Sequence, residues 1–106
     1  MKEYKWNEHG VCINPDVIEI KTNNSDVRIE TAEHGGLWYY GYTYHAAKDG
    51  RSSLNPCMAK FQKGETISNN AIVLAIVDIK RHEKPRGEMQ KKLMELYFDK
   101  AQLLLF

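Results

Sequence analysis

The chain has 106 residues, of which 42% are hydrophobic and 27% are charged, and its formal net charge is +1. This length and composition are typical of one globular domain, so we expect residues 1–106 to form a single domain around one core. The small net charge excludes a protein whose overall field attracts nucleic acid, membranes or acidic substrates.

The first half of the chain alternates apolar and polar residues in the manner of β-strands. Residues 17–21 (VIEIK) and 27–31 (VRIET) both show this alternation and are rich in β-branched residues. The residues between them, TNNSD, favour turns, so the two strands are expected to form a hairpin. A second turn at 33–36 leads into a long third strand, residues 37–46 (LWYYGYTYHA).

The third strand carries an unusual number of aromatic residues. Its even positions place four of them on one face: Trp38, Tyr40, Tyr42 and Tyr44. Such a face can be a platform on which unpaired bases stack, or the floor of a core covered by helices. We favour the core, because the helices need an apolar floor. Tyr39 and His45 then lie on the opposite, wetter face.

A polar stretch interrupts the middle of the chain. Residues 47–56 (AKDGRSSLNP) contain Gly50 and Pro56 and are expected to form a loop. Residues 57–61 (CMAKF) are a candidate for a short fourth strand.

Two helices are expected in the last third of the chain. Residues 68–83 include AIVLAIV, which also fits a buried strand, but the run exceeds the usual strand length and we favour a helix. Pro85 ends this helix. Residues 86–104 are expected to form a second helix, because apolar residues recur at spacings of three and four: Met89, Leu93, Leu96, Tyr97, Leu103 and Leu104.

These elements predict an α+β fold. A three- to four-stranded antiparallel meander precedes two C-terminal helices that pack on one face of the sheet. The other face of such a sheet can stay in contact with water. The apolar ending at residues 103–106 is expected to dock on the sheet or on a second copy, so the C-terminal helix is a candidate homodimer contact.

The basic residues concentrate in the last third, where residues 80–106 hold seven Lys and Arg against four Asp and Glu. Six of them surround the junction between the helices: Lys80, Arg81, Lys84, Arg86, Lys91 and Lys92. A cluster of this kind can contact phosphates or an acidic protein surface. It also fits a solvated helix end, where cations are favourable.

No catalytic or metal-binding signature is present. His9 and Cys12 have a ligand-like spacing, but no second pair accompanies them. Cys57 and His45 can be drawn as a nucleophile and base, as any two such residues can. No phosphate-binding glycine loop or paired-carboxylate motif is seen. We therefore predict no catalytic residue, no metal site, no cofactor and no enzymatic activity.

Two features bear on the compartment. The two cysteines, Cys12 and Cys57, are too few for a disulfide framework and fit a reducing cytoplasm, and whether they pair stays open. The N-terminal residues show no signal-peptide core, and the longest apolar run, residues 71–77, is too short to cross a bilayer. We expect a cytoplasmic protein that does not bind membranes.

The central part of the chain resembles small uncharacterised domains of bacteriophages, plasmids and other mobile elements. The resemblance spans roughly residues 36–82 and is carried by Trp38, Tyr39, Gly41 and Tyr42, then Gly50, Ser52, Ser53, Pro56 and Cys57, then Phe61, Gly64, Glu65 and Ser68. It implies a mobile-element setting. It implies no reaction, because the group has no assigned function and no catalytic residue to transfer.

The leading hypothesis is a small non-enzymatic accessory protein that binds nucleic acid or a nucleic-acid-processing complex. The contacts would come from the six basic residues and from the wetter face of the aromatic strand, Tyr39 and His45. The alternative is a protein–protein module. It would be a homodimer, or an inhibitor such as an anti-restriction or anti-CRISPR protein, with no nucleic-acid binding of its own.

Overall fold

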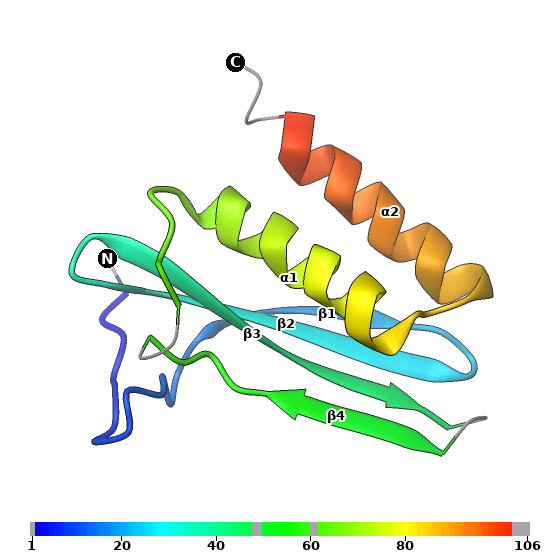
Figure 1. Ribbon diagram of the computed structural model, residues 1–106, viewed down its shortest axis with the longest axis horizontal. Coiled ribbons are helices and arrows are strands. Elements are labelled where there is room, and N and C mark those ends of the chain that lie inside the picture. Colours follow the sequence, from blue (N-terminus) through cyan, green and yellow to red (C-terminus); the bar gives the residue numbers. More distant parts are fainter. Residues whose placement is uncertain (1, 48–49, 60–61, 103–106) are drawn as a thin grey trace.

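The computed structural model describes residues 2–47, 50–59 and 62–102. It is a four-stranded antiparallel meander followed by two helices that pack on one face of the sheet, as the sequence predicted (Figure 1). The strands follow one another across the sheet in chain order: β1 (Asp16–Lys21), β2 (Ser25–His34), β3 (Leu37–Ala46) and β4 (Arg51–Asn55). The helices are α1 (Ser68–Glu83) and α2 (Gly87–Gln102). Helix α1 lies over β2 and β3, and α2 lies beside α1 and over β1.

The long β2–β3 hairpin is the backbone of the sheet. Its register pairs Ser25 with Ala46 at one end and His34 with Leu37 at the other. The turn between the strands is Gly35–Gly36, and both residues have positive φ, at 61° and 83°. Glycine adopts this left-handed conformation without the steric cost of a side chain, which explains why the reversal is so tight.

The fourth strand is not where the sequence placed it. The prediction of a strand at 57–61 is wrong, since residues 57–59 make only one isolated bridge, between Met58 and Val11, and residues 60 and 61 lie outside the described residues. Strand β4 lies instead within the stretch expected to be a loop, where it pairs with the last residues of β3. Its sequence, RSSLN, lacks the apolar alternation of a half-buried strand, and the helices lie mainly over β1, β2 and β3 rather than over β4.

The face of the sheet beneath the helices holds the larger core. The even positions of β3 do face the helices, as favoured from the sequence. Tyr42 and Tyr44 are buried there, and Tyr40 is partly buried against them. The core is completed by Val27 and Ile29 from β2, by Ile72, Ala75, Ile76 and Ile79 from α1, and by Met89 and Leu93 from α2. Trp38 differs, since it is only half-buried and packs edge-on against Tyr4, with ring centroids 5.9 Å apart.

The opposite face is partly covered, which corrects the expectation that Tyr39 lies on a wet surface. The N-terminal segment (residues 2–15) crosses this face on the side away from the helices (Figure 1). Tyr39 is only 8% exposed, and the Trp6 ring meets it edge-on with centroids 6.0 Å apart. Cys12 and Cys57 complete this second core, together with Ala32.

Gly41 explains how the chain after β4 reaches this second core. A Cβ atom at Gly41 would lie 2.2 Å from the backbone nitrogen of Cys57. A side chain at this position would therefore push the crossing backbone away, and only glycine allows the approach. Within the described residues, no helix is long and apolar enough to span a membrane.

Candidate nucleic-acid interface

The C-terminal half of α1 turns its two carboxylates toward the sheet. The hydroxyl of Tyr40 donates a short hydrogen bond to Asp78, and the hydroxyl of Tyr42 donates one of 2.9 Å to Glu83. Ser53 donates to the other oxygen of Glu83 at 2.8 Å, and Glu83 is only 5% exposed. The acidic groups of this helix are therefore held on its inner side.

The tyrosine hydroxyls that hold these carboxylates are themselves shielded. Burial, reinforced by the hydrogen bond to Asp78, raises the pKa of Tyr40 above its ordinary value of about 10. Burial and the hydrogen bond to Glu83 raise the pKa of Tyr42 in the same direction. Both phenols stay protonated at neutral pH and act as fixed hydrogen-bond donors to the carboxylates.

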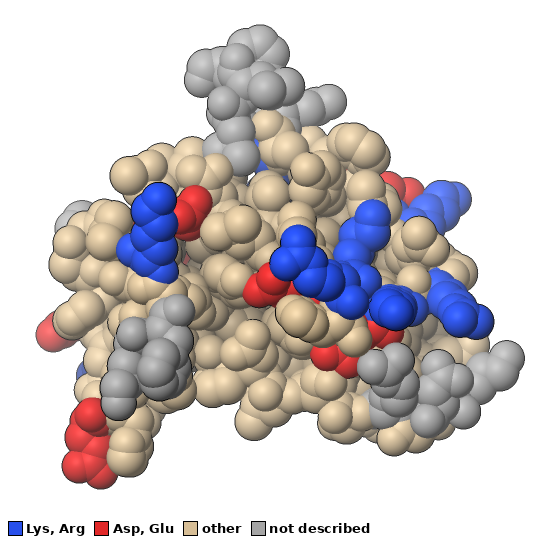
Figure 2. Space-filling view, in the orientation of Figure 1, with Lys and Arg blue, Asp and Glu red and all other residues tan. Residues whose placement is uncertain are grey.

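The cations of the same region point outward. Lys80 and Arg81 on α1, Lys84 at the C-cap of α1 and Arg86 in the turn before α2 are all exposed. In the part of the chain that the structure describes, none of these four side chains forms an ion pair or a hydrogen bond. Figure 2 shows Lys and Arg side chains gathered over the C-terminal end of α1 and the turn into α2. We call these four residues the basic surface.

The other two predicted basic residues differ from each other. Lys91 is exposed and lies one turn before Met94, which lines a groove together with Lys80 and Arg81. Lys92 is instead tied down, because its Nζ lies 3.6 Å from Glu88 and donates to the carbonyl of Lys21 at 3.2 Å. Lys91 is therefore open to solvent on α2, whereas Lys92 links α2 to the edge of the sheet.

Tyr39 and His45 are not part of this surface. They lie on the face of β3 opposite the helices, as expected, but Tyr39 is buried under Trp6 and cannot stack on a base. His45 is exposed and lies between Asp26 of β2 and Ser52 of β4 in the sheet register. The structure thus separates these two residues from the basic ones by the thickness of the sheet.

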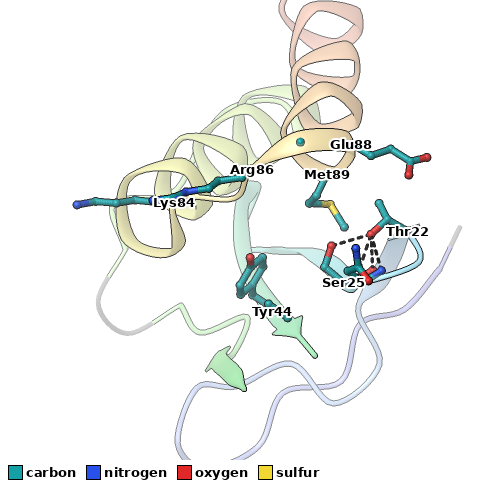
Figure 3. Close-up of a pocket in the computed structure, with 10 residues that line it drawn as sticks. Thr22, Ser25, Tyr44, Lys84, Arg86, Glu88 and Met89 are labelled. Carbon is teal, nitrogen blue, oxygen red and sulfur yellow. Dashed lines mark hydrogen bonds between the residues drawn. The ribbon is translucent and has the colours of Figure 1, made fainter. Parts of the chain in front are cut away.

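A cavity of about 370 Å³ lies between the β1–β2 turn and the start of α2 (Figure 3). The sequence pattern does not indicate this cavity, because TNNSD predicts only a turn and the start of α2 is distant from it in the chain. The residues that line it are Thr22, Asn24, Ser25, Tyr44, Ala46, Lys84, Arg86, Gly87, Glu88 and Met89. The cavity shares Lys84 and Arg86 with the basic surface.

Another groove lies between the helices. This groove of about 390 Å³ is lined by Val77, Lys80, Arg81, Met94 and Tyr97. Two large apolar side chains on the same helices are also exposed, Leu74 at 38% and Phe98 at 57%. The helical layer therefore presents an apolar surface beside the basic one.

The cysteines show no arrangement for catalysis. Both thiols are free and buried, and the backbone nitrogen of Cys12 donates to the carbonyl of Cys57 at 2.9 Å. Burial raises the pKa of Cys57 to about 12, so its thiolate, which is the nucleophilic form, is scarce at neutral pH. Over the described ranges, no three His, Cys, Asp or Glu side chains are grouped so that they could hold a metal ion.

No protein-family model, curated protein or solved structure matches this chain. The resemblance to small mobile-element domains, carried by residues such as Trp38, Gly41 and Cys57, stays a prediction. The function is therefore inferred from the chemistry of the surface.

Proposed function

We propose that this protein is a small, non-enzymatic accessory protein of a phage or other mobile element that binds nucleic acid through its basic surface. One observation carries the proposal: the cations near the end of α1 are exposed and unpaired within the described residues, whereas Asp78 and Glu83 are held on the inner side of the same helix. A helix that only needed solubility would gain more from pairing its charges on the outside.

The basic surface supports phosphate contact in spite of the net charge of only +1. Phosphate oxygens are bound by Lys and Arg side chains that remain free to reach them. The fixed inward position of Glu83 and Asp78 removes the nearest competing anions from this side of α1. The exposed charges near the end of α1 are thus mostly positive although the molecule as a whole is nearly neutral.

Aromatic stacking by Tyr39 has no place in this proposal, since its ring is buried. Affinity through the basic surface would depend on phosphate contacts, and such binding weakens with salt. The logarithm of the binding constant falls with the logarithm of salt concentration by about 0.7 to 0.9 for each phosphate neutralised. Salt dependence therefore reports directly how many of these cations are used.

The test is a fluorescence-anisotropy titration of labelled single- and double-stranded oligonucleotides at two salt concentrations. The variant Lys80→Glu/Lys84→Glu changes two residues of the basic surface. The control Lys5→Glu/Lys63→Glu makes the same change in net charge at two exposed lysines elsewhere. We expect the first variant to bind at least about tenfold more weakly. The slope of its logarithmic binding constant against the logarithm of salt concentration should be less steep by at least about 1. The control should bind like the unchanged protein.

Two results would contradict the proposal. The first is the absence of binding by the unchanged protein at low salt. The second is an equal loss of affinity in both variants, which would show that only the net charge matters and that α1 has no special position.

A second candidate function, a protein–protein module, is supported by the apolar groove between the helices and by Phe98, which is 57% exposed. Exposed aromatic residues beside a groove are typical of contacts between proteins. Light scattering on the same samples separates the two candidates. A dimer whose mass is unchanged by oligonucleotide, together with no anisotropy change, would favour the protein–protein module.

A further inference from the structure

The cavity at the start of α2 adjoins the basic surface. Lys84 and Arg86 line it and also belong to the surface that we propose contacts phosphates. In Figure 3 Thr22 and Ser25 lie on one side of the cavity, next to Met89, and the Lys84 and Arg86 side chains lie on the other side and extend away from Met89 and Ser25. A phosphate bound by the cations would therefore hold its attached sugar and base next to this cavity.

The polar side chains of the β1–β2 turn can still form hydrogen bonds with a ligand. The Thr22 hydroxyl is already fully used, because it accepts from the backbone nitrogens of Asn24 and Ser25 and lies 2.8 Å from the Ser25 hydroxyl. Ser25 Oγ has only this one partner within the described residues. A hydroxyl can donate once and accept twice, so Ser25 can still bind a polar edge. The Asn24 side-chain amide has no partner among the described residues and adds two donors and an acceptor.

The floor of the cavity is apolar. Tyr44, Ala46 and Met89 all line it and are all at least 95% buried. Because so little of these side chains is open, they close the bottom of the cavity with apolar atoms and offer no ring face for stacking. The volume of about 370 Å³ lies within the range of roughly 300–1,000 Å³ that is typical of small-molecule sites.

The carboxylate on the rim does not oppose an anion here. Glu88 points away from Met89 and the cavity in Figure 3. Its oxygen lies 3.6 Å from the Nζ of Lys92, which offsets its charge. The cations Lys84 and Arg86 have no such partner in the described part of the chain.

We propose that this cavity takes one unpaired nucleotide of the bound nucleic acid. Its base would enter the cavity with a polar edge toward Ser25 and Asn24, and its phosphate would meet Lys84 and Arg86, which line the same cavity. This inference rests on the proposed function, because the nucleotide in the cavity belongs to the nucleic acid that the basic surface binds. A base inside a duplex is stacked and paired, so the cavity selects single strands or strand ends.

The first test uses mononucleotides as probes, which do not require binding of a polymer. Backbone amide NMR spectra of the ¹⁵N-labelled protein are recorded with nucleoside 5′-monophosphates, with the matching nucleosides and with inorganic phosphate. We expect shifts at Ser25, Ala46 and Met89, and tighter binding of the monophosphates than of either part alone. Inorganic phosphate that reproduces the same shifts at the same affinity would overturn the role of the base.

The second test uses two variants of nearly equal shape. Ser25→Val removes the hydroxyl and Ser25→Thr keeps it, so both change the cavity volume in the same way. We expect Ser25→Val to lose roughly three- to tenfold in affinity for monophosphates and for single strands, and Ser25→Thr to retain most of it. The dispersion of the amide spectra shows whether each variant is folded.

The outcomes separate the cavity from the basic surface. If Lys80→Glu/Lys84→Glu loses polymer binding while Ser25→Val has no effect and monophosphates cause no shifts, the cavity proposal is wrong and the proposed function stands. If monophosphates bind at Ser25 but no polymer binds, the proposed function is wrong and the cavity is a mononucleotide site. Equal affinity for single- and double-stranded oligonucleotides would also count against the cavity.

Discussion

The two faces of the sheet are covered in different ways. The helix-covered face is closed by α1 and α2, whose apolar residues pack on Val27, Ile29 and the tyrosines of β3. The opposite face is closed at one end only, where the N-terminal segment and residues 57–59 bury Tyr39, while His45 at the other end is exposed. The first cover consists of regular elements with a repeating pattern. The second consists of irregular segments that are far from β3 in the sequence.

The largest effect is expected on the helix-covered face. Ile76 of α1 is completely buried, and Ile76→Ala should lower the free energy of unfolding by roughly 2–5 kcal/mol, because it leaves a cavity in a close-packed core. Urea unfolding followed by circular dichroism measures this. Leu74→Ala, on the same helix but at a position 38% exposed, is the control and should cost clearly less. Equal losses in the two variants would show that α1 does not pack on the sheet as described.

The second-largest loss of stability is expected from one of two tyrosines that lie on opposite faces of β3. Tyr42→Phe removes a 2.9 Å hydrogen bond to the buried carboxylate of Glu83 and should cost about 1.5–3 kcal/mol, as is usual for hydrogen bonds to charged groups. Tyr39→Phe removes a hydroxyl that makes no hydrogen bond within the described residues, and should change stability by less than about 0.5 kcal/mol. Denaturant unfolding of both variants gives the difference. A larger loss for Tyr39→Phe would reverse the comparison.

The helix-covered face could be predicted from the sequence because its pattern is local. The period of two in residues 37–46 and the spacings of three and four in the helices gave the strands, the helices and the inward direction of Tyr40 and Tyr42. The inward direction of Glu83 is also visible in the sequence, since Glu83 continues the buried series of Ile72, Ile76 and Ile79 at helical spacing.

The cover of the opposite face could not be predicted in the same way. Trp6 and Cys12 lie in a segment without a repeating pattern, held by isolated bridges such as the one between Trp6 and Cys12. The exposed residues of the basic surface were visible as a cluster in the sequence. The cavity beside them was not, because the β1–β2 turn and the start of α2 meet only once the helices have folded back onto the sheet.

A smaller effect on stability than in the Ile76 and Tyr42 variants is expected for the irregular cover. Trp6 makes two ring contacts, with Tyr39 and with His34, whose centroids lie 6.0 Å and 5.2 Å away. Loss of the ring contacts alone in Trp6→Ala should cost about 1 kcal/mol, and the loss of buried apolar area adds to this. The more sensitive measurement is alkylation of Cys57 in the folded protein, followed by mass spectrometry of its peptide.

Alkylation requires the thiolate, and burial raises the pKa of Cys57 to about 12 from an ordinary value of about 9. In the unchanged protein, labelling near pH 8.5 should be slow and should rise with pH. Trp6→Ala should admit water, lower this pKa toward its ordinary value and speed labelling about tenfold for each unit by which the pKa falls. Phe98→Ala, which removes an exposed ring on the helical layer, should leave the rate unchanged. Equal rates in all three proteins would show that Trp6 does not shield Cys57, and that the opposite face is closed by residues 57–59 alone.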